Sequence, residues 1–189
     1  MPNVTPSPSK SSAHARTDVD DRYSKPAIFL HWTIVVLVAL AYLAIEVRGP
    51  KGSQGREFWS AIHFWCGSLV LALAVVRLFW RLWNDGPAEI PTSRLQMFAA
   101  RAAHLALYLF IFAQPLLGIL TINAGGHPVQ LPGLNFGITL IGTDDIARSL
   151  FKAAHEFIGN LFYAVIGLHA LGAIFHHVVL RDRTLKRMI

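Results

Sequence analysis

The chain has 189 residues, of which 53% are hydrophobic and 15% are charged, and its mean hydropathy is +0.44. A water-soluble domain of this length is usually less apolar and more charged, so the composition excludes an ordinary soluble enzyme. The net charge of +6 does not indicate nucleic-acid binding, because the basic residues lie between apolar segments and form no separate basic domain.

The N-terminal arm, residues 1–22, is rich in proline, serine and charge, and we expect it to be disordered and cytoplasmic. Four apolar windows follow, each of roughly 20 residues or more and long enough to cross a bilayer core of about 30 Å. They cover residues 27–47, 58–82, 99–122 and 154–180. The first is too long for the core of a secretory signal peptide, and no small-residue cleavage site follows it. Residues 23–189 are therefore predicted to form an all-α, integral membrane four-helix bundle.

The basic residues are distributed unevenly around these windows. With four spans, both ends of the chain lie on one side of the membrane, and most lysines and arginines flank the spans on that side. The basic residues on the other side are Arg48, Lys51, Arg56, Arg148 and Lys152. The positive-inside rule therefore places both termini in the cytoplasm.

The link between the third and fourth windows, residues 123–153, contains the stretch AGGHPVQLPGLNFG. Its glycines and prolines predict an irregular loop that forms a short cap over the outer end of the bundle. The chain has a single cysteine, Cys66, which we expect to be a small core residue of the second span. An internal disulfide and, since no C-x-x-C-H motif occurs, a covalently attached c-type haem are excluded.

Histidines are the unusual feature of the spans, because an ionisable side chain within a membrane is costly and needs a partner. Of the nine histidines, His14 in the arm and His127 in the outer loop are expected to be solvated. His155 and His169 share one helix face, because fourteen residues at about 100° each return to within about 40° of the start. They lie about 21 Å apart along the helix axis. One metal ion cannot bind both, whereas two prosthetic groups, one near each membrane surface, can.

Each of these histidines needs a partner at the same depth on another helix. The topology places His63 at the depth of His155 on the outer side, and His31 at the depth of His169 on the inner side. Imidazole nitrogens bind haem iron axially, and two histidine pairs at two depths are the arrangement that a di-haem b-type bundle requires. His104, near the cytoplasmic end of the third window, is the competing candidate for the place of His31.

Glycines next to the proposed ligands favour the same interpretation. Gly67 and Gly159 each follow a candidate ligand by four residues, and Gly172 follows another by three. A missing side chain at such a place lets a flat macrocycle approach the backbone, although glycine is also common where membrane helices pack. The alternative is that the histidines hydrogen-bond neighbouring helices or line a proton or metal path in a non-redox membrane protein.

Four stretches resemble the bacterial cytochrome b561 family: YSKPAIFLHW, EVRG, IHFWCG and HE…IGLHA…HH. The similarity covers residues 23–188 and is greatest to the superoxide oxidase branch, the superoxide:ubiquinone oxidoreductases. It implies a bacterial inner-membrane bundle with two haems b, ligated by His31, His63, His155 and His169. It also implies superoxide as electron donor at the periplasmic face and ubiquinone as acceptor near the cytoplasmic face. Related members instead serve as electron carriers for a periplasmic dehydrogenase or hydrogenase, so a periplasmic redox protein is the alternative partner.

On the outer face, Lys152 and Arg48 are the candidate cations for attracting superoxide. Lys152 precedes the candidate ligand His155 by three residues and therefore lies on nearly the same helix face. A cation at this place raises the encounter rate with a small anion. The other interpretation is ordinary anchoring of the span ends at the membrane surface. Glu46 and Glu156 are candidates to pair with these cations.

On the inner face, His176, Arg77 and Arg81 are the candidate quinone-binding residues. His176 points within about 20° of His169 and lies about 10 Å nearer the cytoplasm, where it can hydrogen-bond a quinone carbonyl and relay a proton. Arg77 and Arg81 either contact the quinone head, neutralise haem propionates or act as positive-inside anchors. Pro115 predicts a kink in the third span that can shape a quinone cleft.

Overall fold

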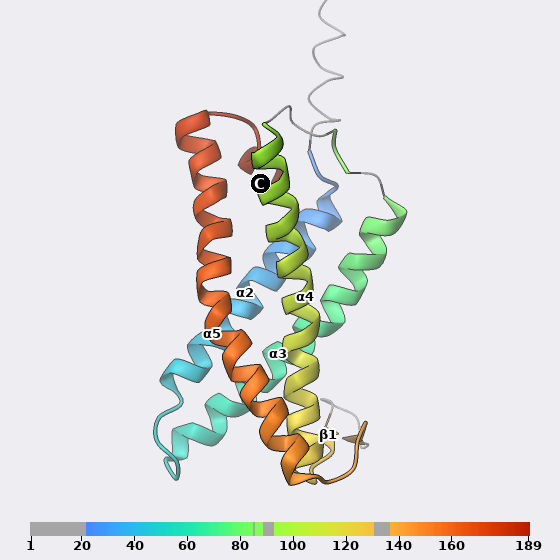
Figure 1. Ribbon diagram of the computed structural model, residues 1–189, viewed down its shortest axis with the longest axis vertical. Helices are drawn as coiled ribbons and strands as arrows, with labels where there is room; N and C mark the ends of the chain where they lie inside the picture. The colour runs from blue at the N-terminus through green and yellow to red at the C-terminus, as the bar shows by residue number, and fades with distance from the viewer. Residues whose placement is uncertain (1–21, 85, 89–92, 131–136) are drawn as a thin grey trace, which may run out of the picture.

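The computed structural model describes residues 22–84, 86–88, 93–130 and 137–189, so the predicted N-terminal arm lies outside the described residues except for Arg22. Four long helices run alternately up and down (Figure 1). They are α2 (Lys25–Val47), α3 (Gln54–Trp83), α4 (Arg94–Ala124) and α5 (Asp145–Phe175). Helix α5 continues into a π-helical turn, η1 (His176–Leu180), and a 3₁₀ turn, η2 (Leu185–Met188), follows. We call the end where α2 begins and η1 ends the terminal end, and the other the opposite end.

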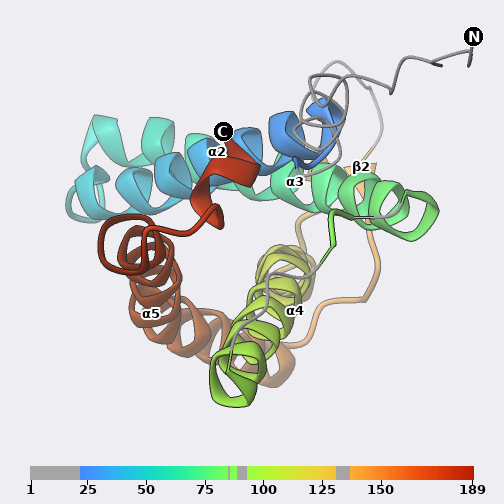
Figure 2. The same ribbon diagram turned by 90° about the horizontal axis from the view of Figure 1, so that it is seen from above.

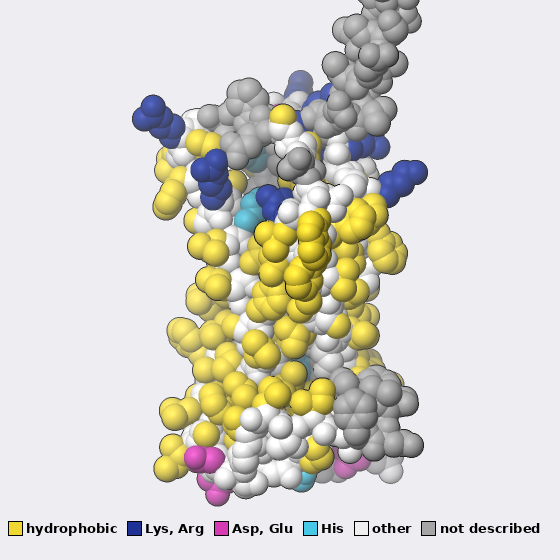
Figure 3. Space-filling model, turned by 90° about the vertical axis from the view of Figure 1, so that its right-hand side faces the viewer, with side chains coloured by type: hydrophobic (Ala, Val, Ile, Leu, Met, Phe, Trp, Pro, Cys, Tyr) yellow, Lys and Arg dark blue, Asp and Glu magenta, His cyan; other side chains and the backbone are white. Residues whose placement is uncertain are grey.

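The four helices match the four predicted spans and are long and apolar enough to cross a membrane. Only 6% to 17% of the residues in their most apolar windows are buried within the protein. Most of the helix surface is therefore apolar and uncovered, as a lipid solvent requires. Figure 3 shows hydrophobic side chains over the middle of the visible face, with lysines and arginines at the terminal end and acidic side chains at the opposite end.

Local sequence signals set where the helices begin. A proline lies in the first turn of α2, where its missing N–H has no helical partner in any case. Ser93 and Gln96 form a capping box at the start of α4. Asp144 caps α5 by accepting hydrogen bonds from the backbone N–H groups of Ile146 and Ala147, both at 2.9 Å.

The helices form two antiparallel pairs. Helix α2 packs along α3, and α4 packs along α5, with a smaller contact between α3 and α4. Seen from the terminal end, α2 and α3 lie together on one side (Figure 2). Ala44 and Ala74 are completely buried and allow close approach in the first pair, whereas Phe110 and Phe162 stack with ring centroids 4.1 Å apart in the second. Cys66 is a buried free thiol, as predicted.

The opposite end carries a short cap in place of a wholly irregular loop. Strands β1 (Val129–Gln130) and β2 (Gly137–Ile138) pair antiparallel, while residues 131–136 are outside the described part. Asn123 at the end of α4 is 1% exposed and organises this cap. Its amide donates to the carbonyl oxygens of His127 and Ile138 at 3.0 and 3.2 Å and accepts from Leu140 N–H at 2.7 Å. His127 is exposed, as expected.

The terminal end is crossed by the segment after α5. The backbone N–H of Tyr23 donates to the carbonyl oxygen of Arg187 at 3.2 Å, and the indole N–H of Trp32 donates to that of Met188 at 2.7 Å. The last residues of the chain are therefore fastened to α2, next to the candidate ligand His31, whose ring lies 5.5 Å from that of Trp32.

The buried amide of Asn123 yields a stability prediction. N123L leaves the N–H of Leu140 and two carbonyl oxygens unpaired, which should destabilise the protein by about 2 kcal/mol or more. Thermal unfolding in detergent is expected to shift down by about 5 °C. The control is N160L, since Asn160 is exposed on α5. Equal melting temperatures for N123L and N160L would contradict the organising role of Asn123.

Candidate functional site

The structure brings His63 of α3 and His155 of α5 together near the opposite end. Their ring centroids lie 5.9 Å apart with an interplanar angle of 84°. Two nitrogens that bind one metal ion from opposite sides lie about 4 Å apart, because each metal–nitrogen bond is about 2 Å long. The separation of the rings fits such a pair with an ion between them.

On both of these rings, a hydrogen bond at Nδ1 leaves Nε2 available to bind a metal ion. Nδ1 of His63 lies 2.9 Å from the carbonyl oxygen of Ala41, and Nδ1 of His155 lies 3.0 Å from that of Gln114. A carbonyl oxygen only accepts, so both Nδ1 atoms carry the proton and donate. Each Nε2 is then an unprotonated lone-pair donor, which is the tautomer and second contact typical of a metal-ligating histidine.

Gln114 of α4, which the sequence analysis did not single out, holds His155 from two sides. Its backbone carbonyl accepts from the ring, and its side-chain Nε2 donates to the carbonyl oxygen of His155 at 3.0 Å. A Cβ on Gly118, one turn along α4, would lie 3.5 Å from the His155 ring. Residues on α4 therefore form part of the surroundings of a histidine on α5. The spacing of residues within a single span does not predict such a contact between two helices.

The glycines that follow the candidate ligands differ in their surroundings. A Cβ added at Gly67 or Gly172 would meet nothing within 4 Å, which leaves space beside the neighbouring histidines. At Gly159 a Cβ would lie 2.8 Å from Nε2 of Gln114, which favours the alternative of close helix packing at this glycine. The backbone of Gly159 instead packs against α4, and its carbonyl accepts from the hydroxyl of Tyr42 at 2.8 Å.

Three imidazoles, rather than two, gather nearer the terminal end, at the level that the sequence predicts to be the inner one. The rings of His104 and His169 lie 5.6 Å apart at an interplanar angle of 69°. His31 is close enough to both for their charges to act on it. The pairing of His31 with His169 stays a prediction, and the structure places His104 of α4 beside them.

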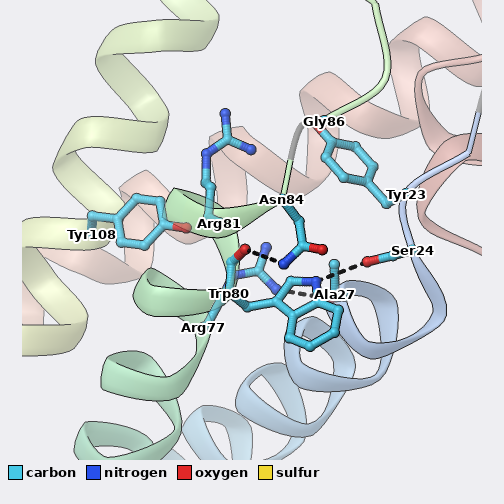
Figure 4. A pocket seen from close by; sticks show the side chains of 9 residues that line it. All are labelled: Tyr23, Ser24, Ala27, Arg77, Trp80, Arg81, Asn84, Gly86 and Tyr108. Carbon is cyan, nitrogen blue, oxygen red and sulfur yellow. Dashed lines mark hydrogen bonds between the residues drawn. The ribbon is translucent and has the colours of Figure 1, made fainter.

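Arg77 and Arg81 lie next to this inner cluster. Arg77 Nη1 donates to the carbonyl oxygen of Ala27, one turn before His31, at 3.0 Å. Both arginines line a cavity at the terminal end (Figure 4). The other lining residues are Tyr23, Ser24, Ala27, Trp80, Asn84, Gly86 and Tyr108. Its volume of about 30 Å³ suits an ordered water and is far below that of a pocket for a quinone ring.

His176 is not among the residues that line this cavity, so the three candidate quinone residues lie in two places. Nδ1 of His176 lies 2.5 Å from Oδ2 of Asp182, a contact that the sequence analysis did not foresee. Pro115 is at neither place. It is buried inside α4 beside Gln114, at the level of the outer histidines, and α4 continues through it.

The cations at the opposite end differ in their surroundings. Lys152 forms an exposed ion pair with Glu156, Nζ to Oε1 2.6 Å, so its charge is locally compensated. Glu46 does not pair with Arg48 and accepts from the hydroxyl of Tyr163 at 2.8 Å. Arg48 ends α2 and is close enough to His63 for its charge to act on that ring.

The chemistry of His63 and His155 favours a group held by two imidazoles over an ion chelated by several side chains. Within residues 22–84, 86–88, 93–130 and 137–189, no group of three or more His, Cys, Asp or Glu side chains could hold a metal ion. Nε2 of His63 and Nε2 of His155 would instead hold a haem, whose iron binds imidazole nitrogens. The orientation of both Nδ1 atoms in the outer pair supports this fit.

Comparison with known proteins agrees. The family model described as prokaryotic cytochrome b561, a family of haem-binding helical bundles, matches residues 22–189. The probable superoxide oxidase CybB of Yersinia pestis is 36% identical over 169 residues, which cover 89% of this chain and 96% of that protein. Cytochrome b561 homolog 1 of Escherichia coli strain K12 is 36% identical over 172 residues, which cover 89% of this chain and 97% of that protein. Cytochrome b561 homolog 2 of the same strain is 31% identical over 179 residues, which cover 92% of this chain and 94% of that protein. The chain therefore belongs to the prokaryotic cytochrome b561 family and is a membrane electron-transfer protein that binds haem b.

Proposed function

We propose that the chain is a di-haem superoxide:ubiquinone oxidoreductase of the bacterial inner membrane, with both termini in the cytoplasm. The opposite end then faces the periplasm and receives electrons from superoxide, and the terminal end delivers them to ubiquinone. The concentration of basic side chains at the terminal end supports this orientation. The name of the relative from Yersinia pestis, probable superoxide oxidase, supports the electron donor.

The observation that carries the proposal is the pair of anchored imidazoles at the opposite end. His63 and His155 present Nε2 from two different helices because each Nδ1 is held by a backbone carbonyl. A haem b held by these two residues would supply one-electron transfer. The helices hold the two rings in place, so the protein has little reorganisation to perform when charge moves.

At the inner level we assign His31 and His169 as ligands, with His104 as the competing residue. Arg77 and Arg81 lie beside this cluster and are suited to compensate the carboxylates of a haem. The small cavity that they line supports this role better than direct quinone binding. His176 is then the residue of the terminal end that is placed to hydrogen-bond a quinone carbonyl.

The overall reaction balances without a further reactant. Two superoxide anions each lose one electron and become dioxygen, and ubiquinone takes up both electrons and two protons to become ubiquinol. Superoxide is an anion, so a cation near the outer histidines should speed its arrival. Arg48 suits this task better than Lys152, because Glu156 compensates the charge of Lys152.

The ligand assignment predicts which variants lose a haem. H63A and H155A should each lose the outer haem and keep the inner one, because the second imidazole alone holds the iron weakly. H31A should lose the inner haem, whereas H104A should keep both. Haem per chain from the pyridine haemochrome spectrum measures this, with H127A, at an exposed loop histidine, as control. Two haems retained in both H63A and H155A would refute the outer pair.

The reaction predicts a direct kinetic result. Pulses of superoxide should reduce the haems of the purified protein anaerobically, and a short-chain ubiquinone analogue should reoxidise them. Stopped-flow absorbance records both steps. Haems that dithionite reduces but superoxide does not would contradict superoxide as donor and favour an electron carrier for a periplasmic dehydrogenase or hydrogenase. Dithionite-reduced haems that the quinone does not reoxidise would contradict the acceptor.

The difference between the two outer cations gives a further prediction. R48Q should lower the second-order rate constant of haem reduction by superoxide about threefold or more. Added salt screens the charge of Arg48, so it should reduce the difference between the rate constants of R48Q and the wild type. K152Q should change it less, because the lysine already faces Glu156. A larger effect of K152Q than of R48Q, by the same stopped-flow measurement, would reverse the assignment.

A further inference from the structure

The end of α5 is built differently from the ends of the other helices. After Phe175 the chain makes the π-helical turn η1, and Arg181 then adopts a left-handed conformation with φ 53°. This reversal lets the backbone N–H of Asp182 donate to the carbonyl oxygen of His176 at 3.1 Å. The turn therefore returns a carboxylate to the imidazole six residues before it.

Both oxygens of this carboxylate have defined partners. Oδ2 of Asp182 lies 2.5 Å from Nδ1 of His176, and Oδ1 accepts from the backbone N–H of Thr184 at 2.8 Å. Burial raises the pKa of Asp182, but the hydrogen bonds from His176 and Thr184 outweigh it, so the pKa lies below its usual value. An ionised carboxylate only accepts, so Nδ1 of His176 carries a proton.

The other ring nitrogen faces a different situation. In the part of the chain that the structure describes, no residue hydrogen-bonds Nε2 of His176. The side chains of His176 and Asp182 are 22% and 21% exposed, so water reaches the pair without surrounding it. Phe175, Val178 and Val179 are exposed apolar neighbours, so the pair lies beside a surface that a membrane-soluble molecule can approach.

We propose that Asp182 and His176 form a proton-delivery pair for quinone reduction, with His176 as the donor and Asp182 as its positioning residue. This inference rests on the proposed function. The bond between Nε2 and its proton breaks as the O–H bond to a quinone carbonyl oxygen forms, and water on the terminal side returns a proton to Nε2. The second proton of the quinol comes from water, and the two electrons come from the haems. Asp182 holds the proton on Nδ1 throughout and stabilises the charged imidazolium.

The substitution D182N tests this arrangement at one atom. The N–H of Thr184 requires an acceptor, so the amide oxygen of the variant faces it and the amide NH₂ faces Nδ1 of His176. The neutral ring must then accept at Nδ1 and carry its proton on Nε2. The imidazolium also loses its counter-charge, although the shape of the turn is kept.

The kinetic experiment uses the di-haem protein reduced with a stoichiometric amount of dithionite and mixed with a short-chain ubiquinone analogue. We expect the maximal reoxidation rate of D182N to fall about a hundredfold, with the quinone concentration for half-maximal rate unchanged. D182E, which keeps a carboxylate, should recover part of the rate. The matched control is D145N, the same change at an exposed residue in the first turn of α5, and it should equal wild type.

Nitrogen-15 NMR of histidine-labelled protein gives a readout that does not depend on turnover. The neutral ring of His176 should change from the Nδ1–H to the Nε2–H tautomer in D182N and not in D145N. Reoxidation of D182N at the wild-type rate, or an unchanged tautomer, would overturn the proton-delivery pair alone. Failure of the quinone to reoxidise the wild-type haems would overturn the proposed function together with this inference.

Discussion

An imidazole inside a membrane must satisfy its N–H without water, and this constraint shapes the bundle at the outer site. In lipid, each unpaired polar group costs several kcal/mol. His63 meets the requirement at the carbonyl of Ala41, and His155 meets it at the carbonyl of Gln114. These hydrogen bonds lower the cost of burying the two rings in an apolar environment, and they also fix the tautomers of the rings. The same contacts therefore stabilise the bundle and leave Nε2 of each ring free to act as a ligand.

The same two bonds explain how the four helices are joined. His63 on α3 bonds to α2, and His155 on α5 bonds to α4, so each outer histidine ties together the two helices of its own pair. Their rings lie 5.9 Å apart between the two pairs, where direct helix contacts are fewer. A group bound between them would therefore connect the two halves of the bundle. Haem binding at this place would stabilise the fold, since a ligand that binds only the folded state stabilises it.

How much the sequence could predict depended on whether one helix carried the signal. The four spans and the shared face of His155 and His169 follow from hydropathy and the helical repeat, and the structure has both. The contacts of Gln114 and the nearness of His104 to His169 depend on how α4 rotates against α5, which no single span encodes. Asp182 was missed for another reason: its approach to His176 depends on a π-helical turn and a left-handed arginine, and neither has a clear sequence signature.

The two ends of the bundle differ in the charges of their side chains, which is consistent with different functions at the two ends. The opposite end carries both acidic and basic residues, of which Lys152 and Glu156 form an ion pair. At the terminal end, anchoring to the membrane surface accounts for most of the basic side chains. Asp182 is the acidic residue that the described ranges place there, and anchoring does not explain it. Its carboxylate accepts from the ring of His176 and from the backbone N–H of Thr184. The carboxylate of Asp182 holds the Nδ1 proton of one imidazole beside the apolar surface of the terminal end, as the proposed delivery of a proton to a quinone requires.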